Sequence, residues 1–244
     1  MDQISFLGLK VDRLSMDEAL TVIAGFIAGR VPRHIVTADA SMVVLARDDK
    51  DLNRIVTNAD LVTPDGAGIL LASRLFGKRI LNKVSGVDLV EQLCRVSSET
   101  GVRLYFLGAA PHVASSAAAR LTESYPGANI VGTRHGYFTD EEEPDVVRQI
   151  AETHPDVLFV AFGIPKQEKF IDRNKAALAI PVCIGVGGSF DVYSGLVKRA
   201  PLWMQNAGLE WVYRLCQNPK KISKVMTLPR FAFIAIWAKV RGAN

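Results

Sequence analysis

Cysteine is scarce in this sequence, and its spacing excludes a disulfide framework and a thiolate metal site. The 244 residues include only Cys94, Cys183 and Cys216, which lie far apart in apolar surroundings and form no C-x-x-C pair. We therefore expect three buried, reduced thiols. The opening residues, MDQISFLGLKVDRL, also lack the basic stretch and apolar run of a signal peptide. Both features predict a cytoplasmic protein.

Common nucleotide-binding and metal-binding signatures are missing as well. No G-x-G-x-x-G follows a predicted strand and no G-x-x-x-x-G-K-[ST] occurs, which argues against a standard dinucleotide site and a P-loop. The four histidines are scattered, so we assign none of them a catalytic role. Asp49-Lys50-Asp51 resembles the D-x-D of many metal-dependent sugar transferases, but its charged neighbourhood favours a solvated helix surface. We expect no metal site.

Length and composition favour one main folded unit. Hydrophobic residues make up 49% and charged residues 22%, which is typical of a globular protein. The chain is long enough for one sizeable α/β core with an appendage, and short for two full domains. We expect a catalytic core over residues 1–195 and a basic, helical appendage over residues 196–244.

Strand and helix patterns alternate along the core. Ser15-Met16-Asp17-Glu18 forms a capping-box pattern, which predicts a helix running to about Arg30. Apolar β-rich segments indicate strands at 35–37, 61–63, 103–107, 129–131, 157–161 and 182–186, and helical patterns cover 66–76, 87–100, 112–124, 142–153 and 167–178. This alternation predicts a Rossmann-like, mostly parallel sheet with helices on both faces.

Three of the predicted strands end in glycine, at Gly108, Gly163 and Gly187. Ligands of open parallel sheets bind beyond the carboxyl ends of the strands, where glycine lets a phosphate or ribose approach backbone amides. Glycine is also an ordinary turn residue, so each position alone is weak evidence. Their recurrence predicts that the three turns line one shared cleft.

Polar residues near these strand ends could carry chemistry. Asp65 follows a predicted strand and precedes a helix, so it is either a crevice carboxylate or the cap of that helix. Lys166 and Gln167 start the helix after Pro165, where they are suited to hold a diphosphate or a sugar hydroxyl. Asp191 is suited to bind a ribose or uracil group, with a solvated loop residue as the alternative.

The C-terminal tail is basic and partly apolar. From Pro201 onward Glu210 is the sole acid among many lysines and arginines. The apolar run FAFIAIWA, residues 231–238, is far shorter than the roughly 20 residues that span a bilayer. Its basic flanks and tryptophan favour a helix lying in the membrane interface. A core helix or a homo-oligomer contact is the alternative.

Several segments together resemble the WecG/TagA/CpsF family of bacterial glycosyltransferases over nearly the whole chain. They are HIVTADA (34–40), VTPDGAGI (62–69), KVSGVDL (83–89), FLGAA (106–110), GYF (136–138), FGIPKQEKFI (162–171), GVGGSFDVYSGLVKRAP (185–201) and GLEWVYRL (208–215). Their occurrence in family order is far more specific than any one of them.

The resemblance implies an inverting, metal-independent transfer of an N-acetylmannosamine-type sugar from UDP to an undecaprenyl-diphosphate-linked sugar. This reaction serves teichoic acid or surface polysaccharide synthesis, with no cofactor and no nucleic acid partner. Asp65 would be the general base, since an inverting transfer needs a carboxylate to take the proton of the acceptor hydroxyl. Thr37 and Gln167 would position the donor. Lys83 stands where arginine is expected and would neutralise the leaving diphosphate as a point charge.

Further substrate contacts are expected on the turns and, by the resemblance, in the appendage. They are Asp39, Gly108, Ala109, Tyr137, Gly163, Pro165, Lys166, Gly187, Asp191, Arg214, Lys221 and Lys224. Among them Tyr137 and Asp191 match positions near the nucleotide, and Asp39 replaces an asparagine, which leaves the donor preference open. The appendage would complete the site when the enzyme docks at the inner face of the cell membrane. The alternative is a non-catalytic nucleotide-sugar-binding protein.

Overall fold

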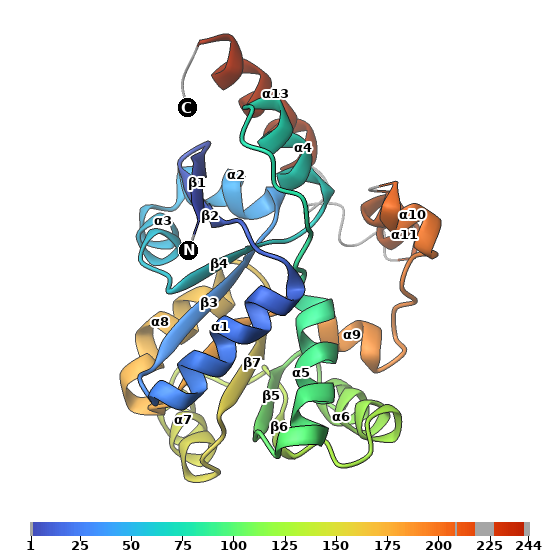
Figure 1. Cartoon of the computed structure of the whole chain (residues 1–244). Coiled ribbons are helices and arrows are strands. Elements are labelled where there is room, and N and C mark those ends of the chain that lie inside the picture. The colour runs from blue at the N-terminus through green and yellow to red at the C-terminus, as the bar shows by residue number, and fades with distance from the viewer. Residues whose placement is uncertain (1, 208, 218–226, 242–244) are drawn as a thin grey trace.

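The computed structural model describes residues 2–207, 209–217 and 227–241. Within these residues the centre of the molecule is a six-stranded parallel sheet with the strand order β4-β3-β8-β7-β5-β6 (Figure 1). The strands are β3 (Arg33–Ala38), β4 (Leu61–Pro64), β5 (Leu104–Gly108), β6 (Ile130–Arg134), β7 (Val157–Ala161) and β8 (Val182–Gly185). All six predicted strands are confirmed, with boundaries that move by a few residues.

Helices cover both faces of the sheet, as predicted. One face packs against α1 (Met16–Gly29), α5 (Gly86–Thr100) and α6 (Val113–Ser124), and the other against α7 (Glu143–Glu152) and α8 (Lys166–Leu178) (Figure 1). Residues of β7 are buried along their whole length, because a parallel strand covered by helices on both sides meets no water. The capping box at the start of α1 is present, with the Ser15 hydroxyl and the Glu18 carboxylate each accepting a backbone N–H. The Rossmann-like fold class is confirmed.

An antiparallel hairpin of β1 (Gln3–Phe6) and β2 (Leu9–Asp12) precedes this core and was not predicted. Asp12 joins it to the sheet, because its Oδ2 accepts a hydrogen bond of 2.8 Å from the backbone N–H of Val62 in β4. The prediction of three buried cysteines is wrong for one of them. Cys94 and Cys183 are buried, whereas Cys216 is exposed on the short helix α11 (Glu210–Gln217), which stands apart from the sheet in Figure 1.

A second layer of helices lies beyond β4. It consists of α2 (Ala40–Asp48), α3 (Lys50–Thr57), α4 (Ala67–Leu75) and the C-terminal α13 (Thr227–Val240), which packs on α2 and α4 (Figure 1). The predicted apolar run of the tail lies on α13 and divides between two faces. Phe231, Ile234, Ala235 and Ala238 are buried in the cluster with α2 and α4, while Phe233, Ile236, Trp237 and Val240 are exposed. The core-helix alternative is therefore right for one face of this helix.

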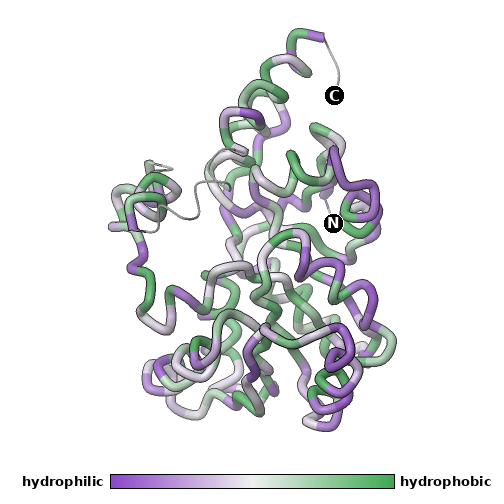
Figure 2. Tube along the Cα trace, turned by 180° about the vertical axis from the view of Figure 1, so that it is seen from behind, coloured by the Kyte–Doolittle hydropathy of each residue, from purple (hydrophilic) through white to green (hydrophobic). Residues whose placement is uncertain are grey.

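Short helices connect the sheet to the appendage. They are α9 (Ser189–Tyr193), α10 (Leu202–Asn206) and α11, and the last two stand apart from the sheet in Figure 1. The Gln217 side chain binds the backbone N–H and C=O of Lys198, so α11 is tied to the segment that leads into α10. Figure 2 shows hydrophobic residues recurring along the C-terminal helix. Within the described ranges, every helix is too short or too polar to cross a bilayer.

Candidate active site

Asp65 lies where β4 ends, against the start of a helix other than its own. Its Oδ2 accepts a hydrogen bond of 3.3 Å from the backbone N–H of Gly86, the first residue of α5. The N-cap of α4, the helix that follows Asp65 in sequence, is Gly66, which has no side chain to offer. The interpretation of Asp65 as the cap of its own helix is thus wrong. The carboxylate lies at the carboxyl edge of the sheet beside a helix N-terminus, which favours negative charge.

Thr37 meets the same helix start from the neighbouring strand. Its hydroxyl donates a hydrogen bond of 2.8 Å to the backbone oxygen of Gly185 in β8, and the residue is almost fully buried. A Cβ on Gly86 would lie 3.4 Å from the Thr37 hydroxyl and 3.2 Å from the Cα of Val186. Gly86 therefore brings α5 close to the ends of β3 and β8 and joins Thr37 to Asp65. The structure brings these two predicted residues together.

Asp39 is the N-cap of α2, a helix that the sequence reasoning did not predict. Its Oδ1 accepts hydrogen bonds from the backbone N–H of Met42, at 3.0 Å, and from the hydroxyl of Ser41. An aspartate at this position satisfies the unpaired amides of the helix start. Asp39 still lies two residues beyond Thr37 at the same edge of the sheet, and its contact with substrate stays a prediction.

Gln167 is buried, with 1% of its surface exposed, and bridges two glycine turns. Its Oε1 accepts hydrogen bonds from the backbone N–H of Gly163, at 3.1 Å, and of Gly187, at 3.0 Å. Its Nε2 donates to Oε1 of Glu168 at 2.9 Å. We expected the glycines to present their amides to a phosphate, but in the structure these two N–H groups point to Gln167. Lys166, at the start of the same helix, is exposed.

A buried acid–imidazole pair lies behind Gln167. Nε2 of His34 is 2.7 Å from Oε2 of Glu168, and both side chains are almost completely shielded from solvent. Sequence reasoning missed Glu168 and left His34 without a role. Glu168 stands within the quoted segment FGIPKQEKFI, but its partner is 134 residues away in sequence, so no local pattern could pair them.

Lys83 faces the appendage. Its Nζ lies 3.6 Å from Oε2 of Glu210 at the start of α11, and both side chains are about three-quarters buried. The predicted partner of the leaving diphosphate is thus paired with the acid of the basic tail. Of the basic residues predicted to help it, Lys221 and Lys224 lie outside the described residues, and the Arg214 side chain is likewise not described although its backbone belongs to α11.

The other predicted contacts lie toward the opposite edge of the sheet. Gly108 has φ 129°, and a Cβ there would come within 2.8 Å of the Ala161 backbone, so the turn after β5 requires glycine. The backbone oxygen of Ala109 accepts a hydrogen bond of 2.9 Å from Gly136, which holds the turn after β6 beside it. Tyr137 follows and is 72% exposed.

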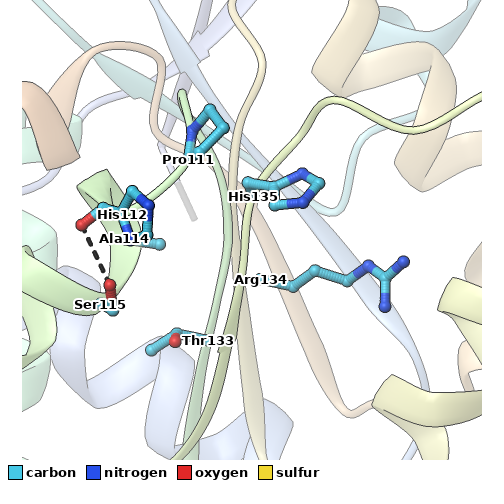
Figure 3. A pocket seen from close by; sticks show the side chains of 7 residues that line it. All are labelled: Pro111, His112, Ala114, Ser115, Thr133, Arg134 and His135. Atoms are coloured by element: carbon cyan, nitrogen blue, oxygen red, sulfur yellow. Dashed lines mark hydrogen bonds between the residues drawn. The ribbon is translucent and has the colours of Figure 1, made fainter.

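An open cavity of about 470 Å³ lies next to these two turns. Figure 3 shows its lining, formed by the start of α6 on one side and the end of β6 on the other. The lining residues are Pro111, His112, Ala114, Ser115, Thr133, Arg134 and His135. The cavity follows β5 and β6, whereas Asp65 follows β4, so the cavity and the carboxylate lie at opposite sides of the sheet.

Asp49 and Asp51 serve the start of α3. Asp49 is its N-cap, and a hydrogen bond from Lys169 lowers the pKa of the Asp49 carboxyl, while Asp51 pairs with Arg54. The favoured interpretation of this segment as a helix surface is confirmed. In the part of the chain that the structure describes, no group of three His, Cys, Asp or Glu side chains is placed to hold a metal ion.

The predicted residues therefore form a row along the carboxyl edge of the sheet, one per strand. In spatial order the row runs through Asp65, Thr37, Gly187, Gly163, Gly108 and Tyr137. Neighbouring strands lie about 4.8 Å apart, so the row spans about 24 Å. Asp191 lies in α9, which follows the turn at Gly187, and is half-buried.

The profile of the Glycosyl transferase WecG/TagA/CpsF family matches residues 4–244. The chain belongs to this family. The resemblance seen in the sequence segments is thereby confirmed, and this WecG/TagA/CpsF protein is a glycosyltransferase.

Three curated relatives of this WecG/TagA/CpsF enzyme share the name N-acetylglucosaminyldiphosphoundecaprenol N-acetyl-beta-D-mannosaminyltransferase. The protein of Bacillus subtilis (strain 168) is 35% identical over 211 residues, which are 86% of this chain and 82% of the relative. That of Bacillus spizizenii is 37% identical over 197 residues, covering 81% and 76%. That of Staphylococcus aureus (strain MW2) is 29% identical over 239 residues, covering 97% and 93%.

Proposed function

We propose that this enzyme transfers N-acetylmannosamine, or a closely related hexose, from UDP to an undecaprenyl-diphosphate-linked sugar, with inversion and without a metal ion. The shared name of the relatives supports the transferred sugar and the lipid-linked acceptor. The position of Asp65 at the carboxyl edge of the sheet is the observation that carries the mechanism. The product would serve teichoic acid or surface polysaccharide synthesis.

Asp65 acts as the general base. As the acceptor hydroxyl attacks the anomeric carbon, its proton passes to the carboxylate, and the bond from that carbon to the UDP oxygen breaks with its electron pair going to the diphosphate. The hydrogen bond from the Gly86 N–H to Oδ2 holds the carboxylate at the carboxyl edge of the sheet, where the acceptor hydroxyl would meet it. Attack opposite the leaving group gives inversion.

The donor lies along the row of strand ends, with its sugar near Asp65 and Thr37 and its nucleotide toward Gly108 and Tyr137. Two observations support this direction. The exposed Tyr137 ring and the cavity beside it are suited to a base and ribose, and the opposite end carries the carboxylate that the chemistry needs. The diphosphate then lies between them, where Lys83 and the basic residues of the appendage balance its charge in place of a metal ion.

The enzyme docks at the inner face of the cell membrane through its C-terminal helices. On α13 the exposed apolar side chains are flanked by Lys239 and Arg241, and α4, which packs on α13, exposes Leu71 and Leu75 next to Arg74. Apolar side chains with basic neighbours suit an anionic lipid interface. Docking brings the site to a substrate whose polyprenyl chain stays in the bilayer.

Transfer to a synthetic N-acetylglucosaminyl-diphospho-lipid, in the presence of a chelator, tests this function. We expect UDP release and formation of a disaccharide lipid with UDP-N-acetylmannosamine, and none when the acceptor is omitted. Stabilisation by UDP-sugars without any transfer product would instead support a non-catalytic nucleotide-sugar-binding protein.

A further inference from the structure

Two central turns of the crevice, at Gly163 and Gly187, are held together by one buried amide. Both turns have a positive φ, 78° and 55°, and follow the adjacent strands β7 and β8. Their N–H groups converge on Oε1 of Gln167. The spacing of the two turns, and with it the floor of the crevice, therefore depends on which way the Gln167 amide faces.

The orientation of that amide is set by Glu168. A glutamine side chain has an oxygen that accepts and a nitrogen that donates, and the two ends are nearly equal in shape. A carboxylate on one side requires the nitrogen there, which leaves the oxygen for the two glycine N–H groups. If the amide turned over, its oxygen would face the Glu168 carboxylate and its nitrogen would face two donors.

Glu168 is in turn fixed by His34. The carboxylate is 0% exposed, and a buried acid is stable only when its oxygens are hydrogen-bonded. Oε1 accepts from Gln167, and Oε2 lies 2.7 Å from Nε2 of His34. Both oxygens thus have a partner, and the low dielectric of the interior strengthens each bond. A continuous series of hydrogen bonds thus runs from His34 through Glu168 to Gln167.

This series of hydrogen bonds also lies close to Thr37, through Gly185 of β8. A Cβ on Gly185 would lie 2.5 Å from both Nε2 of Gln167 and Oε1 of Glu168, so β8 has no side chain where the pair packs. The backbone oxygen of the same Gly185 accepts the hydroxyl hydrogen bond of Thr37. Gly185 therefore contacts both the buried Gln167–Glu168 pair and Thr37, the predicted donor-positioning residue.

We propose that Glu168, supported by His34, is a positioning residue for the sugar donor: it fixes Gln167 so that the Gly163 and Gly187 turns hold one spacing under the diphosphate. The donor role rests on the function proposed above. Gln167 then acts from beneath the crevice through the two turns. The imidazole of His34 has a structural place in the site even though it does not reach the substrate.

The test compares two replacements of Glu168 by two independent readouts. Glu168→Met removes the acceptor, and Glu168→Gln keeps an oxygen for Gln167. Amide hydrogen exchange of Gly163 and Gly187 reports on their hydrogen bonds to Oε1 of Gln167 and requires no enzymatic activity. Steady-state kinetics then separate the KM for the UDP-sugar from the KM for the lipid acceptor.

We expect Glu168→Met to speed the exchange of both glycine amides at least tenfold and to raise the donor KM about tenfold, with the acceptor KM unchanged. Glu168→Gln should return both readouts to within about threefold of the native protein. Asp156→Leu is the matched control, because this buried acid accepts hydrogen bonds from the Arg30 side chain and the Arg103 backbone N–H at the amino ends of the strands. It should lower stability without changing either readout.

The proposal is overturned if the two glycine amides stay protected in Glu168→Met, or if Glu168→Gln behaves like Glu168→Met. An equal rise in donor KM in Asp156→Leu would also overturn it, since general destabilisation would then explain the effect. If Glu168→Met does not fold, Glu168→Ala, which leaves room for water, is judged by the same readouts. A protein that shows the exchange pattern but no transfer would contradict the proposed function and its donor role, while the fixing of the two turns by Glu168 would stand.

Discussion

Nζ of Lys83 lies 3.6 Å from Oε2 of Glu210, so the lysine that we propose to bind the diphosphate is paired with the acid of the appendage. A diphosphate that reaches Lys83 must compete with this carboxylate. The contact joins the core of the enzyme to α11 before substrate is bound.

Glu210→Gln should therefore tighten UDP binding. The pair is partly exposed, and such ion pairs are worth up to about 1 kcal/mol, which corresponds to about a fivefold lower Kd. Titration calorimetry at low and high salt measures the effect, which should shrink as salt screens the charges. Weaker UDP binding by the variant would show that Glu210 supports the nucleotide site instead of competing with it.

Gly108→Ala should destabilise the protein by about 1–3 kcal/mol, because the added Cβ meets the Ala161 backbone at a φ that L-residues rarely adopt. Gly25→Ala is the matched control. This glycine lies within α1 with no described atom within 4 Å of its added Cβ, so alanine should stabilise by about 0.5–1 kcal/mol. Urea unfolding of both variants measures the contrast. Equal stability of the two would contradict the close approach of β5 and β7 at this turn.

Asp60 should make stability depend on pH in the acid range. Burial raises the pKa of its carboxyl, but hydrogen bonds from Arg33 and the His34 amide, helped by Lys175, lower it overall. A lowered pKa in the folded state contributes stability above the unfolded value of about 3.9, and this is lost as pH falls through the folded pKa. Asp60→Asn should thus cost about 1–3 kcal/mol at pH 7. The difference from the native protein, measured by urea unfolding, should shrink below about pH 4. A constant difference across this range would exclude the ionised carboxylate as its source.

The exposed face of α13 should decide membrane association. Ile236→Ser and Trp237→Ser together remove exposed apolar side chains and leave the buried face of the helix intact. We expect flotation with anionic liposomes to be lost while the melting temperature stays unchanged. Val31→Ser, at an exposed apolar residue before β3, is the control and should bind liposomes normally. Undiminished binding by the double variant would move the docking surface away from α13.

The core of this fold follows from local sequence patterns. Val157–Ala161 reads as a buried strand because a parallel strand with helices on both faces needs an apolar side chain at every position. The helix α2 escaped prediction for a related reason. Six of its nine residues are buried, so its sequence shows no alternation of polar and apolar faces. The strands of the first hairpin have only four residues each, too few to show a period.

The site was harder to predict than the fold, because it is built from contacts between residues that are distant in sequence. Asp65 could be selected from its place after a strand, but its contact with Gly86, 21 residues later, could not be predicted from the segment itself. Gln167 was selected from its place at the start of a helix and by the resemblance, yet its burial and its hydrogen bonds to two turns could not be predicted from the segment itself. From the sequence alone, polar residues such as Glu168 and His34 are expected at the surface. Their burial as a pair follows only from the tertiary structure.

The most direct test of the account is single-turnover transfer by Asp65→Asn. Asn keeps the hydrogen bond from Gly86 but cannot take a proton, so we predict a rate loss of about 10²–10⁴-fold with UDP binding within threefold of the native enzyme. Asp88→Asn, which changes a second carboxylate in the first turn of α5, should keep the rate within tenfold. Turnover by Asp65→Asn at the native rate would contradict the central claim that this carboxylate is the base.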